Sequence, residues 1–191
     1  MLTKVVVSGF LAVTAPMVVP APALAHVTVG VSVGVFHERL SPYGQWIGIG
    51  RYGSCWRPSS VAPEWRPYTV GYWAYGDDGW TWESDEAWGW ATYHYGRWTY
   101  DASAGWAWIP GLQWGPAWVT WRLDAEVVGW APQFAGSRSW AVEHPAATFW
   151  TFVPRAQFRT GVPVARAAYA SQHFDVLWSR FGGAYPPGQQ R

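Results

Sequence analysis

"GRWTYDASAGWAWIP", residues 96–110, alternates large aromatic residues with small or polar ones on both sides of a short polar stretch. Trp98 and Tyr100 are two residues apart, and so are Trp106 and Trp108. Side chains two residues apart lie on the same face of a β-strand, whereas a helix would spread them around its circumference. The Asp- and Gly-containing stretch between the two pairs is typical of a tight turn. The segment therefore predicts a β-hairpin with an aromatic face.

The same pattern recurs at regular intervals along the chain. "GYWAYGDDGWTWES", residues 71–84, repeats the aromatic alternation around a Gly-Asp-Asp-Gly turn. Each unit opens with Gly-x-Trp and carries Gly-x-x-Trp after its turn. These pairs are Gly44/Trp46, Gly71/Trp73 and Gly96/Trp98, followed by Gly53/Trp56, Gly79/Trp82 and Gly105/Trp108. The second series advances by 26 residues each time, which predicts an internal repeat of β-hairpins.

Strands are expected along most of the chain, from residue 27 to residue 131. The opening "VTVGVSVGVF" (27–36) alternates valine with small or polar residues, and "WVTWRLDAEVVGW" (118–130) resembles another hairpin. Further on, "FWTFVPRAQF" (149–158) predicts one more strand. A short helix is expected near the C-terminus, where helical spacing joins Phe174, Leu177, Trp178 and Phe181. The predicted fold class is all-β, with antiparallel hairpin repeats in a small sheet or barrel-like domain and a less regular C-terminal segment.

The N-terminus has the three parts of a secretory signal peptide. Lys4 precedes the apolar run "VVVSGFLAVTAPMVV", and Ala23-Leu24-Ala25 is a small-residue cleavage site. We expect cleavage after Ala25 and export to the periplasm or the extracellular space, with no integral membrane span after cleavage. The expected organisation is a signal peptide (1–25), a Trp-rich β-repeat domain (26–132), a C-terminal extension packing on it (133–181) and a loose tail (182–191).

Charge and cysteine content exclude several classes of protein. Lys4 is the only lysine, so the mature chain balances 12 arginines against 12 acidic residues, and this neutrality argues against a nucleic-acid partner. The one cysteine, Cys55, forms no internal disulfide, so the fold must be stable without one. We interpret Cys55 as a small buried side chain.

No motif in the sequence indicates catalysis. The five histidines are scattered, and none lies at metal-ligand spacing from a cysteine or a carboxylate. The close acidic pairs, Asp77-Asp78 and Asp85-Glu86, lie in turn-like sequence, whereas a glycosidase needs two carboxylates that face each other across a cleft. We therefore predict a protein that is not an enzyme, with no metal and no cofactor.

Several segments resemble one family of bacterial proteins. "ERLSPYGQW", "CWRPSSVAPEWRPYTVGYW", "GWTWESDEAWGWATYHYGRW", "WGPAWVTWR" and "VGWAP" follow in this order between residues 38 and 132. They are similar to exported proteins named for a Tyr-x-Trp-Gly-x-Trp repeat, which carry a domain of unknown function. The exact hexapeptide is absent here, and Trp88-Gly89-Trp90 is among its nearest forms. The resemblance implies export and a Trp-rich β-domain, and it brings no catalytic residues.

Eighteen tryptophans exceed what a core of this size needs, so part of them is expected on the surface. Two functions compete: a structural or interaction scaffold of the cell envelope, and a module that binds a glycan, either peptidoglycan or an exopolysaccharide. Partners would accordingly be cell-wall glycan or another envelope protein, and the sequence leaves the oligomeric state open. The residues predicted to bind a glycan are Trp88, Trp90, Tyr93, Tyr95, Arg97 and Trp114.

Processing of the signal peptide can be tested directly. Protein recovered from the envelope fraction of an expressing bacterium should begin at His26, because the signal regions occur in the required order before a small-residue site. Intact-mass spectrometry measures this. A mass that retains the residues from Met1 to Ala25 would contradict the prediction.

Overall fold

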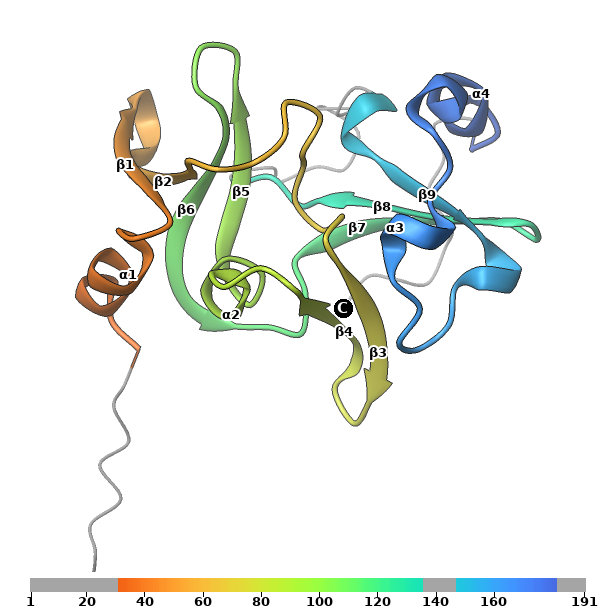
Figure 1. The fold of residues 1–191 in the computed structure, drawn as a ribbon, viewed down its shortest axis with the longest axis horizontal. Coiled ribbons are helices and arrows are strands. Elements are labelled where there is room, and N and C mark those ends of the chain that lie inside the picture. Colours follow the sequence, from red (N-terminus) through yellow and green to blue (C-terminus); the bar gives the residue numbers. More distant parts are fainter. Residues whose placement is uncertain (1–30, 136–146, 182–191) are drawn as a thin grey trace, which may run out of the picture. The chain divides into compact units, whose positions relative to one another are not determined.

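The computed structural model describes residues 31–135 and 147–181. The predicted signal peptide, its cleavage site and the predicted loose tail lie outside the described residues. Within them, short strands dominate, and short helices are placed before, between and after them (Figure 1).

Nine strands and several short helices make up the described part. The strands are β1 (Gly44–Ile49), β2 (Gly53–Pro58), β3 (Gly71–Gly76), β4 (Gly79–Ser84), β5 (Tyr95–Asp101), β6 (Gly105–Trp114), β7 (Val119–Leu123), β8 (Val127–Pro132) and β9 (Thr151–Pro154). The α-helices are α1 (Val33–Leu40), α2 (Gly89–Thr92), α3 (Val164–Ala167) and α4 (Phe174–Ser179). Single 3₁₀ turns are η1 (Gly50–Tyr52), η2 (Ala147–Phe149), η3 (Arg155–Gln157) and η4 (Ser171–His173).

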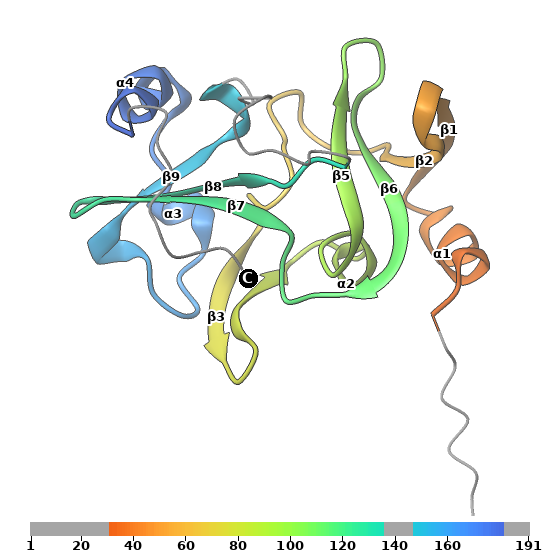
Figure 2. The same ribbon diagram turned by 180° about the vertical axis from the view of Figure 1, so that it is seen from behind.

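The strands form three small antiparallel sheets. One has the order β1-β2-β6-β5, the second consists of the β3-β4 hairpin, and the third has the order β7-β8-β9. The view from behind shows β9 beside the β7-β8 hairpin, where it pairs with β8 (Figure 2). The predicted all-β class with antiparallel hairpins is confirmed, and in the described residues the strands form open sheets instead of a closed barrel.

Each hairpin places one tryptophan directly opposite another. The facing pairs are Trp46 and Trp56, Trp73 and Trp82, Trp98 and Trp108, and Trp121 and Trp130. Facing residues in an antiparallel pair project from the same side of the sheet, so their rings contact each other. Trp56 also faces Trp108 across the β2-β6 pairing, which extends two of these pairs into one row across the four-stranded sheet.

Two glycines show why the repeat keeps glycine and tryptophan in place. Gly79, the first residue of β4, has φ of 82°, a backbone conformation that residues other than glycine rarely adopt. Gly96, on β5, has φ of 65°, and a Cβ there would lie 2.1 Å from the carbonyl oxygen of Ile109 and 2.9 Å from Nε1 of Trp108. The first glycine of a repeat thus leaves room for the return-strand indole, while the second makes the turn.

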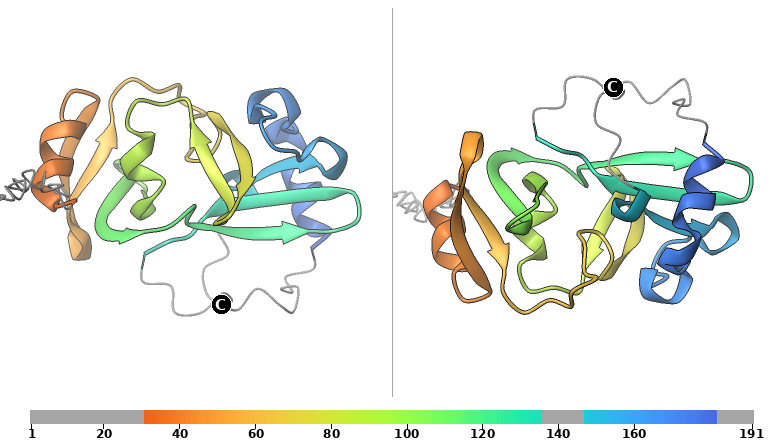
Figure 3. Two further views of the ribbon diagram at one scale, coloured as in Figure 1. Left: turned by 90° about the horizontal axis from the view of Figure 1, so that it is seen from below. Right: turned by 90° about the horizontal axis from the view of Figure 1, so that it is seen from above.

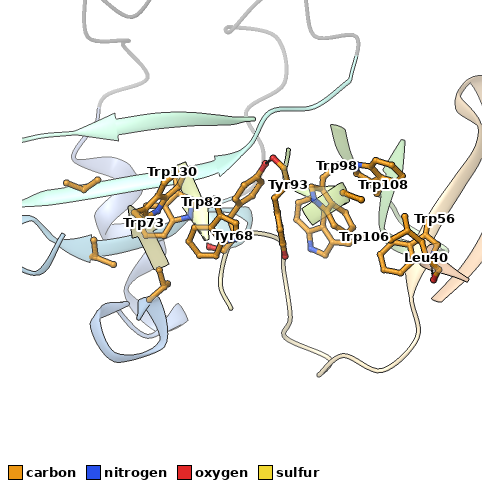
Figure 4. Close-up of a cluster of buried hydrophobic side chains, with 14 of the residues drawn as sticks. Leu40, Trp56, Tyr68, Trp73, Trp82, Tyr93, Trp98, Trp106, Trp108 and Trp130 are labelled. Atoms are coloured by element: carbon orange, nitrogen blue, oxygen red, sulfur yellow. Dashed lines mark hydrogen bonds between the residues drawn. The ribbon is translucent and has the colours of Figure 1, made fainter. Parts of the chain in front are cut away.

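Most of the buried aromatic side chains form one continuous cluster, and Trp150, Phe152 and Phe174 belong to a second one. Figure 4 shows Tyr93 between two groups of rings, one around Tyr68 and Trp82 and the other around Trp98. Tyr68 lies parallel to Trp73, with ring centroids 6.3 Å apart. Seven tryptophans are fully buried in the described chain: Trp56, Trp73, Trp82, Trp98, Trp108, Trp130 and Trp150.

The predicted strand at residues 27–36 is wrong over its described portion, where α1 begins at Val33. Ser32 caps this helix by accepting a hydrogen bond from the backbone N–H of Val35 at 3.4 Å. Phe36 and Leu40, four residues apart, are fully buried, and Phe36 packs edge-on against Trp108 at 5.1 Å. The valine alternation favours a strand, but a helix buries Phe36 and Leu40 together on one face. Burial of such a face supplies most of the stability of a helix, so the helix forms.

The C-terminal part of the described chain adds to the third sheet and covers it. β9 pairs with β8, in agreement with the strand expected in residues 149–158. The expected short helix is α4, with Phe174 and Leu177 buried against Phe152 and its neighbours. Figure 3 shows α4 beside the β8-β9 end of the sheet. No helix in residues 31–135 or 147–181 is long and apolar enough to cross a membrane.

The close approach at Gly96 can be tested by substitution. Gly96→Ala should lower the free energy of unfolding by about 3 kcal/mol, because the methyl group meets the Ile109 carbonyl and the backbone has positive φ. Gly76→Ala, where a Cβ meets no atom within 4 Å, should change it by less than about 1 kcal/mol. Urea unfolding curves compare the two. Equal losses would show that the indole-over-glycine contact does not hold the hairpin.

Candidate binding cleft

The residues predicted to bind a glycan do not share one exposed face. Trp88 is half-buried, with its ring 5.6 Å from that of Trp56. Tyr93 is fully buried, and its hydroxyl donates a hydrogen bond to Glu86, so it does not lie on the surface as expected. The reason is that α2 intervenes before β5 and turns this ring into the core.

The remaining predicted residues lie near the end of the β5-β6 pairing where Tyr95 faces Trp114. Trp90 and Tyr95 are half-buried against Phe36. The guanidinium of Arg97 lies 3.2 Å from the ring centroid of Trp118. Trp114 is 45% exposed, faces Tyr95 across the strands, and stacks on the imidazole of His94. Most of these side chains thus serve packing, and Trp114 is the one that presents a large exposed face.

A cleft of about 520 Å³ lies elsewhere in the molecule. It is bounded by β1, β2, the loop from residue 59 to residue 66, the turn between β5 and β6, and η2. Its volume falls within the 300–1,000 Å³ range typical of pockets that hold small ligands. The lining residues with functional side chains are Gln45, Arg57, Glu64, Trp65, Arg66, Tyr100, Trp106, Thr148 and Phe149.

Three aromatic rings form one wall of this cleft. Tyr100 and Trp106 face each other across the β5-β6 hairpin, with centroids 5.4 Å apart. Phe149 of η2 lies 4.9 Å from Tyr100 and 5.0 Å from Trp106. Tyr100 is 46% exposed, whereas Trp106 is almost buried. The wall therefore offers the ring of Tyr100 to a ligand on a support made by the other two.

Two arginines line the polar side of the cleft. Arg57 on β2 donates to the carbonyl oxygen of Ala104 at 3.3 Å and to Oε1 of Gln45 at 3.4 Å. Arg66 donates through Nε to Oγ1 of Thr151 at 3.3 Å. Within residues 31–135 and 147–181, neither arginine forms a salt bridge with a carboxylate.

Arg66 contacts the C-terminal part of the described chain. Its guanidinium carbon lies 4.8 Å from the ring centroid of Phe174 in α4, and Thr151 belongs to β9. Burial lowers the pKa of the Arg66 guanidinium, because the charged form loses solvation. These contacts orient the guanidinium at the edge of the cleft.

The loop that carries Trp65 and Arg66 is anchored in the core by Tyr68. This residue has φ of 63°, an uncommon conformation for a side chain other than glycine that costs roughly 1–2 kcal/mol. Its hydroxyl donates to the carbonyl oxygen of Tyr93 at 3.2 Å and accepts the backbone N–H of Trp118 at 3.0 Å. Stacking on Trp73 completes the anchor, so the loop leaves the core at a defined point.

A half-buried carboxyl group orients Trp65 in the cleft wall. Glu86 accepts hydrogen bonds from Nε1 of Trp65 at 2.6 Å, from the hydroxyl of Tyr93, and from Oγ of Ser84 at 3.3 Å. Burial raises the pKa of Glu86, although the three hydrogen bonds lower it in part. Asp85-Glu86, interpreted from sequence as a turn pair, therefore includes a residue that supports the site.

The lining of the cleft offers several kinds of side chain to a ligand. Its lining residues include one carboxylate, Glu64, whereas glycoside hydrolysis uses two facing carboxylates. In the described portion of the chain, no group of three or more histidine, cysteine, aspartate or glutamate side chains could hold a metal ion. Aromatic rings, guanidinium groups and amides on the lining suit a ligand with both flat apolar faces and polar substituents.

Sequence reasoning missed this cleft because its residues come from four separate segments. The one available signal was "APEWRP" (62–67), which combines a tryptophan and an arginine with two prolines in a loop. Nothing in the sequence shows that this loop meets the β5-β6 turn and η2.

A comparison with known protein families finds a match for part of this chain. The model of a family described as a family of unknown function, DUF6600, matches residues 37–137. No curated protein and no solved structure matches the chain. The matched range includes the first eight strands and all of the cleft except its η2 side.

Glu86 predicts a pH dependence of stability. Because its pKa is raised on folding, its contribution is full below the unfolded-state pKa and is lost as the pH rises through the folded-state value. Glu86→Gln stays neutral at all pH values, so the stability of the wild type relative to this variant should be greater at about pH 4 than at about pH 8. Urea unfolding at both pH values measures the difference.

Glu83, exposed on β4, supplies the matched control. Glu83→Gln should leave the pH dependence of the wild type nearly unchanged. A stability difference for Glu86→Gln that stayed constant or grew with pH would contradict the assigned role of burial.

Proposed function

The chain belongs to DUF6600, a family of unknown function, and we propose that it is an exported scaffold domain of the cell envelope that binds a saccharide in its cleft. Export after Ala25 and the likeness to proteins with Tyr-x-Trp-Gly-x-Trp repeats are parts of this proposal. They rest on the N-terminal sequence and on the segments between residues 38 and 132. The reaction class is binding, without catalysis.

The observation that carries the saccharide proposal is that the supported ring of Tyr100 and two arginines line one cleft. A pyranose ring has a flat face of C–H groups that stacks on an aromatic ring, and its hydroxyls hydrogen-bond to guanidinium and amide groups. Tyr100, backed by Trp106 and Phe149, supplies the ring, while Arg57 and Gln45 supply polar partners.

The burial of the tryptophans supports the scaffold part of the proposal. Each facing pair contains at least one fully buried ring, and Trp114 alone among the described tryptophans is a large exposed one. Most of the aromatic surplus therefore serves to hold the hairpins together. A rigid framework of this kind keeps the cleft preorganised, which lowers the entropic cost of binding.

A scaffold that binds another envelope protein, without a saccharide, is the second candidate. The exposed Trp114, with Leu112 on the same strand at 59% exposure, favours it, because exposed apolar side chains near each other mark contact surfaces. The two candidates place the binding surface in different parts of the molecule, which makes them separable by substitution.

The test compares equivalent tyrosines of two repeats. Tyr100→Ala should weaken binding about tenfold or more to any polysaccharide that retains the wild-type protein. Stacking of a nucleic-acid base on one aromatic side chain contributes about 1–3 kcal/mol, and we expect a similar contribution here. Tyr75, which faces Trp80 as Tyr100 faces Trp106 but lies outside the cleft, is the matched control, and Tyr75→Ala should bind normally. Retention on insoluble peptidoglycan and a panel of polysaccharides, followed by titration calorimetry, measures both.

Two outcomes would contradict the saccharide proposal. Absence of retention on every polysaccharide would leave the second candidate in its place. Loss of binding in Trp114→Ala, with Tyr100→Ala unaffected, would move the site to the residues around His94. Thermal melting of each variant confirms that the fold is intact.

A further inference from the structure

The charged residues on the lining of the cleft indicate a more specific ligand than a neutral sugar ring. Its lining carries two arginines against one acidic residue, Glu64, which is exposed and forms no ion pair with either arginine. The protein as a whole is nearly neutral, with 13 basic and 12 acidic residues. The excess positive charge is therefore confined to the cleft. A nearly neutral molecule as a whole would not attract an anion over a long range.

Arg66 is built into the structure in the manner of a positioned recognition group. One side of its guanidinium is occupied by the Nε hydrogen bond to Thr151, a buried residue, and by contact with the Phe174 ring. Its Nη1 and Nη2 groups have no acceptor in the described part of the chain. A guanidinium held in one orientation, with two parallel donors remaining, matches the two oxygens of a carboxylate.

Arg57 approaches the same cleft from β2. Both of its hydrogen bonds, to Ala104 and Gln45, are long and to uncharged acceptors, so a carboxylate would be a stronger partner than either. Arg57 also faces Gln45 in the β1-β2 register, which places a neutral amide next to it for a sugar hydroxyl. The arginines thus offer a subsite for an anionic group and Gln45 a subsite for a neutral one, in the cleft that Tyr100 also lines.

We propose that the cleft selects saccharides whose units carry a carboxylate, with Arg66 as the principal carboxylate-binding residue and Arg57 as a second one. This inference rests on the proposed saccharide function and names the class of ligand. Two sources share that chemistry: uronic acid units of an exopolysaccharide, and glycan strands of peptidoglycan freed of their stem peptides, whose lactyl groups end in a carboxylate. The pyranose ring lies against Tyr100 in either case.

The experiment compares two probes that differ at the carboxyl group alone. Oligogalacturonate and its methyl ester have the same rings and linkages, but the ester has no free carboxylate. The wild type should bind oligogalacturonate about tenfold more tightly, the effect of one charge-assisted hydrogen-bonded pair. This preference should shrink as sodium chloride is raised, because the pair is partly exposed. Peptidoglycan glycan strands form a second arm that identifies the source.

Variants then assign the preference to individual residues. Arg66→Gln should remove most of the preference and leave affinity for the methyl ester unchanged, and Arg66→Lys should restore only part of it. Arg57→Gln, at a residue outside the Thr151 and Phe174 contacts, should reduce the preference by a smaller factor. Arg39→Gln is the charge-matched control, because Arg39 lies over Trp90 in another part of the fold.

The outcomes separate this inference from the proposed function. Equal affinity for oligogalacturonate and its methyl ester would overturn carboxylate selection while leaving saccharide binding intact. A preference that persisted in both folded variants, Arg66→Gln and Arg57→Gln, would also overturn it. Failure of Arg66→Gln to fold shifts the decision to Arg57→Gln and to the wild-type comparison of the two probes. If neither probe nor any polysaccharide binds, the proposed function itself fails.

Discussion

An indole that faces a second indole across a hairpin, and covers a glycine on the partner strand, is the contact on which the rest of this fold depends. Trp108 faces Trp98 and covers Gly96, and Trp82 repeats the arrangement over Gly71. Each contact fixes strand register, since a slip of one residue would turn the rings to the opposite face of the sheet. The repeat therefore specifies three short hairpins without a disulfide, and Cys55 is free and buried.

The energetic balance of these rings explains their number. Burial of one tryptophan removes about 150–250 Å² from water, which contributes about 4–6 kcal/mol at 25 cal/mol per Å². The indole N–H groups of Trp73, Trp82 and Trp98 are buried without an acceptor among the described residues, and each such donor costs roughly 1–3 kcal/mol. Burial outweighs this cost. The indole N–H groups of Trp56, Trp108 and Trp130 donate to backbone carbonyls in α1, in β5 and in the loop that carries Tyr68, respectively, so they join these strands to other elements.

The framework also determines where a ligand can bind. Because the rings in the centre of the cluster contact one another, they are not available to a ligand, and the accessible aromatic surface lies at the hairpin ends. Tyr75 and Tyr100 occupy equivalent places in two repeats, but only the second meets η2 and the loop that carries Arg66. A repeated hairpin thus becomes a candidate site in the copy where η2 and the loop that carries Arg66 line the same cleft.

Part of this architecture is readable in the sequence, and part is not. The two-residue spacing of Trp73 and Tyr75 determines that they share a strand face, and the turn at Asp77-Asp78 determines their partners on β4. Such contacts are local, so pattern alone identifies them. The same reasoning fails at Val33–Leu40, where valine alternation favours a strand but the core accepts Phe36 and Leu40 as one face of a helix.

By itself, the sequence determined the hairpins, their aromatic faces, the turn glycines and the absence of an internal disulfide. Tertiary structure alone decided which rings are exposed, because burial depends on neighbours far apart in the chain. It buried Tyr93 against Tyr68 and Glu86, and it brought Arg66 and Tyr100 to the lining of one cleft. The sheet order β1-β2-β6-β5 joins the first hairpin to the third, a pairing that no local spacing encodes. That long-range pairing, together with the packing of residues 147–181, creates the cleft.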